Sequence, residues 1–496
     1  MKNQVQLITY VDRLGGGNLQ QLTQLLEGPL KGVFGGVHLL PFFDAIDGAD
    51  AGFDPTDHTQ VDPRLGNWDD IRALSKVVDV MADAIVNHMS SASPQFQDLC
   101  ARGDASPYAG MFLTMDSVFP NGAREQDLLT VYRPRPGLPF TAMALGNGQK
   151  KMLWTTFTPQ QLDIDVAHPQ GQAYLTSILQ RFADSGIRMI RLDAAGYAIK
   201  KAGTSCFMLP ETFDFISRFT QQAQGMGMEV LVEIHSYYQR QIEIAKRVDW
   251  VYDFALPPLV LNTLFFGNSK ALKDWIRIRP QNALTVLDTH DGIGIIDIGA
   301  DPADRAHHPG LLPPEQLDQL VERIHTNSNG QSRQATGAAA SNLDLYQVNC
   351  TFYDALGRNG LAYLLARAVQ LFMPGVPQIY YVGLLAGEND MDLLVRSGVG
   401  RDINRQRFSA GEIAEALQKP VVKDLMELIR LRNTCTAFGG AFELLPSSDG
   451  TLHLLWTHTD SRAELFVDFS DLGYKLVVTD KHHAGMRDVR FSHTLS

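Results

Sequence analysis

The sequence predicts an α/β protein whose main unit is a (β/α)8 barrel. Short apolar runs alternate with amphipathic helical patterns along most of the 496 residues. Parallel strands that are covered by helices show this alternation, and eight such strands in one chain favour closure into a barrel. The eight predicted strands are residues 5–10, 37–40, 80–86, 187–193, 228–233, 250–254, 284–287 and 376–381.

Helical patterns lie between the predicted strands and continue after the last one. Asn18 can cap the first helix, in which Leu19, Leu22 and Leu26 share one face. Pro420 is a suitable first residue for the last helix. The other predicted helices cover residues 170–184, 210–225, 257–278 and 358–373.

Two stretches interrupt the alternation, and both follow a predicted strand. Residues 88–167 are rich in Pro, Gly and Ser, and residues 292–357 are polar and contain glycines. Insertions after barrel strands project from the C-terminal face of the barrel, where they shape substrate sites. After residue 437 the pattern changes to short strands joined by turns. The predicted domains are a barrel (1–87, 168–291 and 358–437), an inserted domain B (88–167), a second inserted domain B′ (292–357) and a C-terminal β domain (438–496).

Composition and charge narrow the class of protein. A hydrophobic fraction of 45% and a charged fraction of 20% are typical of a globular protein. The formal net charge of -12 argues against nucleic acid and anionic membranes as partners. The sequence shows neither a signal peptide nor an apolar run of about 18 residues, so we expect a cytoplasmic protein. The four cysteines are scattered and form no CxxC pair, which argues against a zinc or redox site.

Three carboxylates lie at the ends of predicted strands: Asp193 and Glu233 each end a strand, and Asp291 lies just past another. Arg191 lies two residues before Asp193 and therefore on the same side of the strand, where it would keep that carboxylate ionised, as a nucleophile requires. Glu233 follows an apolar run, and burial tends to raise the pKa of a carboxyl group, as a general acid requires. A single carboxylate at a strand end is more often a helix cap or an ion-pair partner. Three at matched strand ends favour catalysis.

Four ordered motifs resemble those of the α-amylase superfamily, glycoside hydrolase family 13. They are DAIVNH (83–88), RLDAAGY (191–197), EIHSYY (233–238) and VLDTHD (286–291). The resemblance implies that Asp193 is the nucleophile, Glu233 the general acid and base, and Asp291 the residue that stabilises the oxocarbenium-like state. It implies retention of configuration, for which the two reacting carboxyl groups lie about 5–5.5 Å apart.

Further stretches resemble the members of this family that cleave sucrose with phosphate. Among them are YRPRPGLPF (132–140), LDLYQVN (343–349) and GRDINR (400–405). This resemblance implies a transferase that converts sucrose and inorganic phosphate reversibly into α-D-glucose 1-phosphate and D-fructose. The reaction would pass through a covalent β-glucosyl-enzyme, and other acceptors would also receive the glucosyl group. Relatives of this kind are often homodimers.

The same resemblance assigns two groups of substrate-binding residues. The glucosyl ring and its surroundings would be contacted by Asp50, Phe53, His88, Phe157, Gln161, Arg191, His290 and Arg401. Fructose and phosphate would be contacted by Arg135, His235, Asp344, Tyr346 and Gln347, on loops that exchange these contacts by moving. A phosphate dianion beside carboxylates needs a cation and hydrogen-bond donors. Arg135 is the best candidate for that cation, although by position alone a solvated loop arginine is a serious rival reading.

No cofactor and no metal ion are expected. Amylases of this superfamily often hold calcium between the barrel and the first insertion. The residues that follow His88 here, MSSASPQF, contain no carboxylate ligand set.

Three alternative functions remain open at this point. One is a sister phosphorylase that uses sucrose 6′-phosphate, glucosylglycerol or glucosylglycerate, and another is an α-glucoside hydrolase or transglucosidase. Phosphate-dependent release of glucose 1-phosphate separates a phosphorylase from a hydrolase, and an acceptor panel separates the phosphorylases. The third is a non-catalytic binding barrel, which is disfavoured because all three carboxylates are present.

Overall fold

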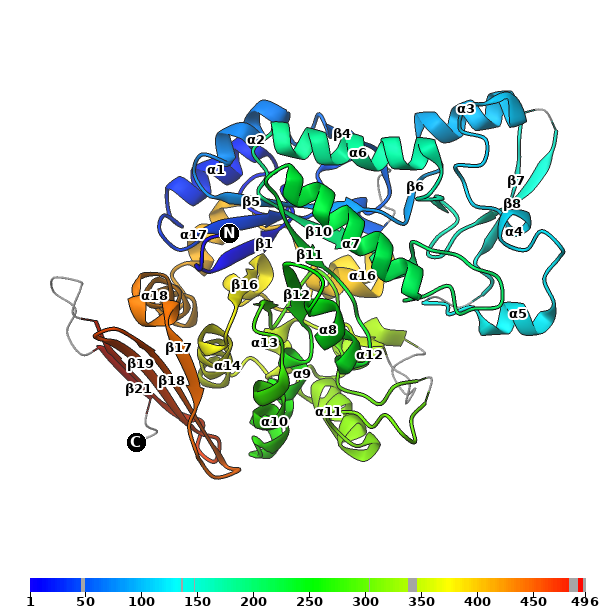
Figure 1. Ribbon diagram of the computed structural model, residues 1–496. Helices are drawn as coiled ribbons and strands as arrows, with labels where there is room; N and C mark the ends of the chain where they lie inside the picture. Colours follow the sequence, from blue (N-terminus) through cyan, green and yellow to red (C-terminus); the bar gives the residue numbers. More distant parts are fainter. Residues whose placement is uncertain are drawn as a thin grey trace.

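A closed barrel of parallel strands forms the centre of the protein (Figure 1). The computed structural model describes residues 1–45, 50–134, 137–146, 148–302, 304–337, 346–480 and 489–493. The barrel strands are β1 (Gln6–Thr9), β2 (Gly36–Leu39), β5 (Asp79–Ile85), β10 (Met189–Asp193), β11 (Glu229–Val232), β12 (Trp250–Asp253), β13 (Ala283–Thr285) and β16 (Val376–Tyr380). β1 closes the barrel because it pairs with both β2 and β16. All eight predicted strands and the predicted fold class are confirmed.

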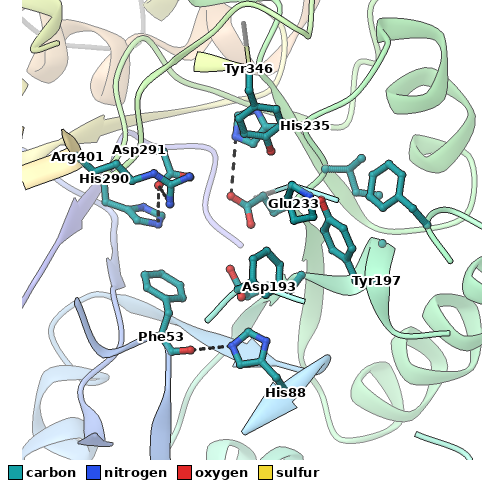
Figure 2. Close-up of a pocket in the computed structure, with 16 residues that line it drawn as sticks. Phe53, His88, Asp193, Tyr197, Glu233, His235, His290, Asp291, Tyr346 and Arg401 are labelled. Carbon is teal, nitrogen blue, oxygen red and sulfur yellow. Dashed lines mark hydrogen bonds and ion pairs between the residues drawn. The ribbon is translucent and has the colours of Figure 1, made fainter. Parts of the chain in front are cut away.

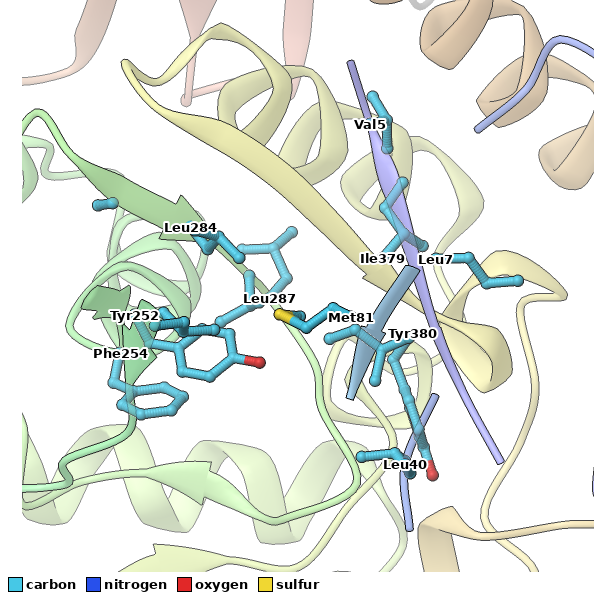
Figure 3. Close-up of a cluster of buried hydrophobic side chains, with 14 of the residues drawn as sticks. Val5, Leu7, Leu40, Met81, Tyr252, Phe254, Leu284, Leu287, Ile379 and Tyr380 are labelled. Atoms are coloured by element: carbon cyan, nitrogen blue, oxygen red, sulfur yellow. The ribbon is translucent and has the colours of Figure 1, made fainter. Parts of the chain in front are cut away.

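The barrel strands are buried along almost their whole length, which explains their continuous apolar runs. Figure 3 shows Leu7 of β1, Met81 of β5, Leu284 of β13 and Ile379 of β16 in one cluster. Each of these side chains is at most 2% exposed. Fully burying a side chain of this size stabilises a fold by about 1.5–3 kcal/mol. The apolar interior therefore fixes the barrel and, with it, the places where its strands end.

Helices cover the outside of the barrel. They are α1 (Leu19–Glu27), α2 (Trp68–Leu74), α6 (Pro169–Asp184), α7 (Pro210–Gly225), α8 (Tyr238–Ala245), α9 (Leu256–Phe266), α10 (Lys270–Ile278), α14 (Gly360–Phe372) and α18 (Pro420–Thr434). The side chain of Asn18 caps α1 by accepting from the backbone N–H of Gln21 at 2.9 Å, as predicted. The single helix predicted over 257–278 is wrong. Gly267 adopts a left-handed conformation (φ 67°), which ends α9 before α10 begins.

The first insertion follows β5 and extends away from the barrel on the side opposite the C-terminal sheet (Figure 1). It contains β6 (His88–Ser90), α3 (Pro94–Arg102), η2 (Gly103–Ala105), α4 (Met115–Val118), α5 (Glu125–Thr130), β7 (Phe140–Ala144), β8 (Lys150–Trp154) and β9 (Gln161–Asp163). β6 pairs with β9, so the two ends of the insertion lie side by side. This pairing places the start and the end of the insertion next to the barrel mouth.

The second insertion follows β13. It contains β14 (Ile293–Gly294), α11 (Pro314–Asn327), α12 (Gln331–Thr336), β15 (Gln347–Val348) and α13 (Phe352–Ala355). The expectation of an irregular polar stretch missed α11. This helix buries only a narrow stripe that includes Leu320, Val321 and Ile324, and its remaining residues are mainly polar. A narrow stripe gives a weak periodic signal.

Shorter elements complete the barrel mouth. Between β2 and β5 lie β3 (Phe43–Ala45), η1 (Asp50–Gly52) and β4 (Pro55–Val61), and η3 (Ala195–Tyr197) follows β10. After β16 come α15 (Tyr381–Leu384), α16 (Met391–Ser397), η5 (Gly400–Asn404) and α17 (Ala410–Ala416).

A five-stranded antiparallel sheet follows α18 and η6 (Thr436–Gly439). Its strands are β17 (Ala441–Leu444), β18 (Thr451–His458), β19 (Ser461–Asp468), β20 (Gly473–Thr479) and β21 (Val489–His493). The indole N–H of Trp456 donates to the carbonyl of Phe372 at 2.8 Å, which ties the sheet to the end of α14. Among the helices in the described ranges, none combines the length and the apolar character that a membrane span requires.

Candidate active site

The three predicted carboxylates line one cavity at the C-terminal ends of the barrel strands (Figure 2). Asp193 is the last residue of β10, Glu233 directly follows β11, and Asp291 lies in the loop after β13. The cavity has a volume of about 180 Å³. Its lining consists of Phe53, His88, Pro134, Phe157, Asp193, Ala194, Gly196, Tyr197, Phe207, Glu233, Ile234, His235, His290, Asp291, Tyr346 and Arg401.

Arg191 joins two of the three carboxylates from below the cavity. Its Nη1 lies 3.2 Å from Oδ1 of Asp193, and its Nη2 lies 2.6 Å from Oε1 of Glu233. Nη1 also pairs with Asp83 of β5. Burial alone would lower the pKa of Arg191, but Glu233, Asp83 and Asp193 raise it well above its usual value. The guanidinium is therefore a permanent cation between the two groups expected to react.

The surroundings of Glu233 differ from the expectation. The sequence suggested an apolar environment for this residue, whereas the structure places Arg191 at 2.6 Å and Nε2 of His235 at 4.0 Å from its Oε1. Apolar residues do precede Glu233 on β11. The apolar residues before Glu233 therefore do not by themselves prepare it as an acid.

Asp291 faces two arginines from the segment after β16. Nη1 of Arg401 lies 2.9 Å and Nη2 of Arg405 lies 3.8 Å from its Oδ1. Burial alone would raise the pKa of Asp291, but Arg401, His290 and Arg405 lower it below the usual range. Asp291 is therefore a carboxylate at any pH at which the protein is expected to work.

Aromatic rings form a wall of the cavity that begins beside Asp291. The ring of Phe53 stacks on His290 with centroids 4.9 Å apart and planes at 10°. Nε2 of His88 donates to the carbonyl of Phe53 at 2.9 Å, and Phe157 packs against the His88 ring at 5.3 Å. Burial lowers the pKa of His290 to about 3, so His290 is a neutral ring at neutral pH.

Three further predicted residues support the lining without being part of it. Arg191 lies beneath the carboxylates, as described above. Gln161 donates to the carbonyl of Phe53 at 3.2 Å. Gln347 contacts Nε2 of His235 at 3.2 Å and accepts from Arg401 at 3.4 Å. The side chain of Asp50, and Arg135 and Asp344, lie outside the described residues.

Sequence reasoning missed several residues of the site. Tyr197 and Phe207 pack together, with ring centroids 4.7 Å apart, and both line the cavity. Tyr197 closes the motif that contains Asp193, and this position was the available signal. Asp83 and Asp297 pair with Arg191 and His235 respectively. Their roles depend on contacts between distant segments, which spacing along the chain does not reveal.

The ammonium group of Lys200 lies among oxygen atoms of the barrel and the first insertion. Nζ of Lys200 lies 2.7 Å from Asp163 and 2.8 Å from the amide oxygen of Asn87, and it also donates to the carbonyl of Tyr197. Carboxylate, amide and carbonyl oxygens are ligands that calcium prefers. The lysine supplies a cation here, which is in line with the expectation of no metal ion.

Glu233, His235 and Asp291 form the one cluster in the described ranges with the spacing of metal ligands. One atom of each lies within 4.8 Å of the others. Arg191 already pairs with Glu233, and Arg401 already pairs with Asp291. Two neighbouring cations disfavour a metal ion by electrostatic repulsion, so the absence of a metal remains our prediction.

A closed (β/α)8 barrel with carboxylates at three strand ends is the architecture of the α-amylase class. The family model "Alpha amylase, catalytic domain" matches residues 11–249. The chain is 62% identical over 470 residues to a sucrose phosphorylase of Agrobacterium vitis. This alignment covers 95% of this chain and 96% of the relative. It is 57% identical over 465 residues to a sucrose phosphorylase of Bifidobacterium adolescentis, which covers 94% and 92%.

A solved structure of a related phosphorylase has the same fold over nearly the whole chain. The sucrose 6F-phosphate phosphorylase from Thermoanaerobacter thermosaccharolyticum matches with a TM-score of 0.91 at 36% identity, covering 99% of this chain and 98% of that one. The chain therefore belongs to the α-amylase family and, within it, to the sucrose phosphorylase group.

Proposed function

We propose that the protein transfers a glucosyl group from sucrose to inorganic phosphate, with release of D-fructose and α-D-glucose 1-phosphate. The observation that carries the proposal is the pair of carboxylates, Asp193 and Glu233, that face the same buried guanidinium of Arg191. The identities of 62% and 57% to sucrose phosphorylases support sucrose as the donor. Transfer to acceptors other than phosphate is part of the same proposal.

The first step uses Asp193 as the nucleophile. Its carboxylate attacks the anomeric carbon of the glucosyl unit while Glu233 gives its proton to the departing fructose oxygen. Arg191 supports this step because its Nη1, at 3.2 Å, favours the ionised form of Asp193. The product is a covalent β-glucosyl-enzyme.

The second step returns the glucosyl group to an acceptor. Glu233, now ionised, takes the proton of the incoming phosphate, whose oxygen attacks the anomeric carbon and displaces Asp193. Two inversions give overall retention. Asp291 is held as an anion by Arg401, and we assign it to the ring hydroxyls and the positive charge of the transition state.

The cavity offers different surfaces to the two halves of the substrate. Phe53, His88, Phe157 and His290 form a wall that suits the apolar face and the hydroxyl groups of one glucosyl ring. His235 and Tyr346 lie on the other side of Glu233 in Figure 2, and we assign that side to fructose and phosphate, together with Arg135, Asp344 and Gln347.

A product assay tests the proposal. The protein is incubated with sucrose and phosphate, and glucose 1-phosphate, fructose and free glucose are measured. Equal amounts of glucose 1-phosphate and fructose are expected. Release of free glucose without glucose 1-phosphate would show a hydrolase instead.

The sister phosphorylases are the second candidate. The structural match to a sucrose 6F-phosphate phosphorylase favours this alternative specifically, although at 36% identity. Sucrose and sucrose 6′-phosphate are compared as donors for phosphorolysis, and glucosylglycerol and glucosylglycerate are included in the same series. Sucrose is expected to give the highest kcat/KM.

The cellular compartment and the oligomeric state are further parts of this proposal. We propose a cytoplasmic enzyme, in line with a reaction between two small metabolites, and a homodimer as the assembly. Light scattering on the purified protein measures the second. A mass of about one chain, 54.9 kDa, would rule out the dimer under the conditions of the measurement.

A further inference from the structure

Asp297 lies directly behind His235 and is 0% exposed. Its Oδ2 accepts from Nδ1 of His235 at 2.9 Å. Its Oδ1 accepts from the side chain of Gln241 at 2.7 Å and from the backbone N–H of Ser236 at 3.2 Å. Both carboxylate oxygens are therefore engaged, and the contact with Oδ2 requires a proton on Nδ1 of His235.

A glycine makes this close contact sterically feasible. A Cβ atom on Gly294 of β14 would lie 2.2 Å from Oδ2 of Asp297 and 3.4 Å from Nδ1 of His235. Gly294 pairs with Gln347 of β15, which in turn contacts Nε2 of His235. Two residues of the second insertion therefore contact the two nitrogens of the His235 ring: Asp297, which follows β14, and Gln347 of β15.

The remaining surroundings of His235 are anionic or aromatic. Nε2 lies 4.0 Å from Glu233, and Asp291 lies on the same side of the cavity. Phe254, which follows β12, stacks on the ring at 3.8 Å, and Tyr346 packs against it at 5.5 Å. Burial alone would lower the pKa of His235, but Asp297, with Glu233 and Asp291, raises it above its usual value.

An incoming phosphate dianion enters a cavity that is lined by carboxylates. Three carboxylates, Asp193, Glu233 and Asp291, line the cavity and repel phosphate. Arg191 and Arg401 are already paired with these carboxylates. A protonated imidazole fixed through Nδ1 presents Nε2–H beside Glu233, where the acceptor must arrive, and a charge-assisted hydrogen bond is stronger than a neutral one.

We propose that Asp297 is a positioning residue for the acceptor step, which fixes His235 through Nδ1 so that Nε2–H donates to a phosphate oxygen beside Glu233. Without phosphate, the amide nitrogen of Gln347 lies 3.2 Å from Nε2 of His235, and its oxygen accepts from Arg401. A half-turn of this amide exchanges the two atoms, so that the oxygen accepts from Nε2–H. This inference rests on the proposed function. It concerns the acceptor side of the cavity, where His235 meets fructose in the first step and phosphate in the second.

The first test is Asp297→Asn, which retains the size of the side chain and removes its charge. Sucrose hydrolysis without phosphate and phosphorolysis at varied phosphate are measured between about pH 6 and pH 8, on either side of the ordinary histidine pKa. The KM for phosphate is expected to rise about tenfold. Hydrolysis is expected to fall less than phosphorolysis at low phosphate, because Asp297 does not contact the glucosyl side and His235 meets fructose in the first step alone.

The pH dependence gives a readout that a purely structural role would not change. Removal of the anionic partner lowers the pKa of His235, so in Asp297→Asn the KM for phosphate rises at a lower pH than in the unmodified protein. Titration of phosphate itself is common to both proteins and cancels in the ratio of their KM values.

A second variant and a matched control complete the test. Gly294→Ala displaces Asp297 and should reproduce the rise in KM. Asp301→Asn serves as the control because Asp301, from the same insertion, pairs with Arg240 at 3.0 Å instead of with a residue that lines the cavity.

Three results would contradict either the positioning role of Asp297 or the proposed function. An unchanged KM for phosphate at every pH in both variants overturns the positioning role, and so does a parallel fall of hydrolysis and phosphorolysis. An unmodified protein that forms no glucose 1-phosphate overturns the proposed function itself, before any variant is compared.

Discussion

The two sides of the cavity are built in different ways. On the glucosyl side, Phe53, His88 and His290 are held by one another through a hydrogen bond of 2.9 Å and a stacked pair, close to the barrel strands. On the acceptor side, Pro134 and Tyr346 belong to the two insertions, and Phe207 belongs to the segment after η3. The carboxylates for glucosyl transfer therefore lie at or after barrel strands, whereas the longer connecting segments contribute Pro134, Tyr346 and Phe207 to the acceptor side.

Loss of the nucleophile should have the largest effect, and it should slow hydrolysis and phosphorolysis equally. Asp193→Asn retains the size of the side chain but removes the charge that attacks the anomeric carbon. We expect hydrolysis and phosphorolysis both to fall by about 10⁴-fold or more, with an unchanged thermal unfolding temperature. Activity above one tenth of that of the unmodified protein in either assay would remove Asp193 as the nucleophile.

The next largest effect should come from the glucosyl side. Arg401→Ala removes the cation 2.9 Å from Asp291, so the transition state loses an oriented group. Both reactions should slow by about 10²-fold, measured as kcat/KM for sucrose. Arg407→Ala is the control, because Arg407 pairs with Asp12 and its side chain is exposed. A change confined to the KM for phosphate would move Arg401 to the acceptor side.

A smaller and selective effect is expected on the acceptor side. Arg135→Ala removes the proposed cation for phosphate, so the KM for phosphate should rise by about tenfold, which is more than sucrose hydrolysis should slow. Arg133→Ala, two residues earlier, is the matched control, since Arg133 donates to the carbonyl of Gly137 on the surface. Equal losses in both assays would contradict the division of the cavity into two sides.

A separate prediction concerns stability and pH, with no selective effect on either side of the cavity. Burial lowers the pKa of His290, and likewise that of His58 behind the glucosyl side, from 6.5 to about 3. Because the unfolded chain binds protons at these groups between pH 6.5 and 3 and the folded chain does not, stability falls on acidification. Each histidine should cost about 2 kcal/mol between pH 7 and pH 5.

Urea unfolding at the two pH values measures this loss. His58→Gln should reduce the difference by the share of one histidine. A stability that rises on acidification would contradict the neutral state of the two rings.

The barrel and the catalytic residues were accessible from sequence because both depend on local patterns. Eight apolar runs mark the strands, and Asp193, Glu233 and Asp291 each follow one of them. The break at Gly267 was missed because the apolar pattern continues across it. α11 was missed because its narrow apolar stripe gives only a weak helical periodicity in the sequence.

Contacts across the site were the harder part. The pairing of Asp297 with His235 and of Asp83 with Arg191 joins segments that are distant in sequence. The cation beside Glu233 was likewise not expected, although Arg191 had been assigned to Asp193. A residue's position in a strand indicates which side it faces, whereas its partners depend on the register of neighbouring strands.

The central claim is that glucosyl transfer passes through a covalent bond to Asp193. The most direct test is mass spectrometry of protein that is denatured during turnover of sucrose without phosphate, followed by peptide mapping. The account predicts a mass increase of one glucosyl unit on the peptide that contains Asp193. An increase on the peptide that contains Glu233, or none while sucrose is being consumed, would contradict it.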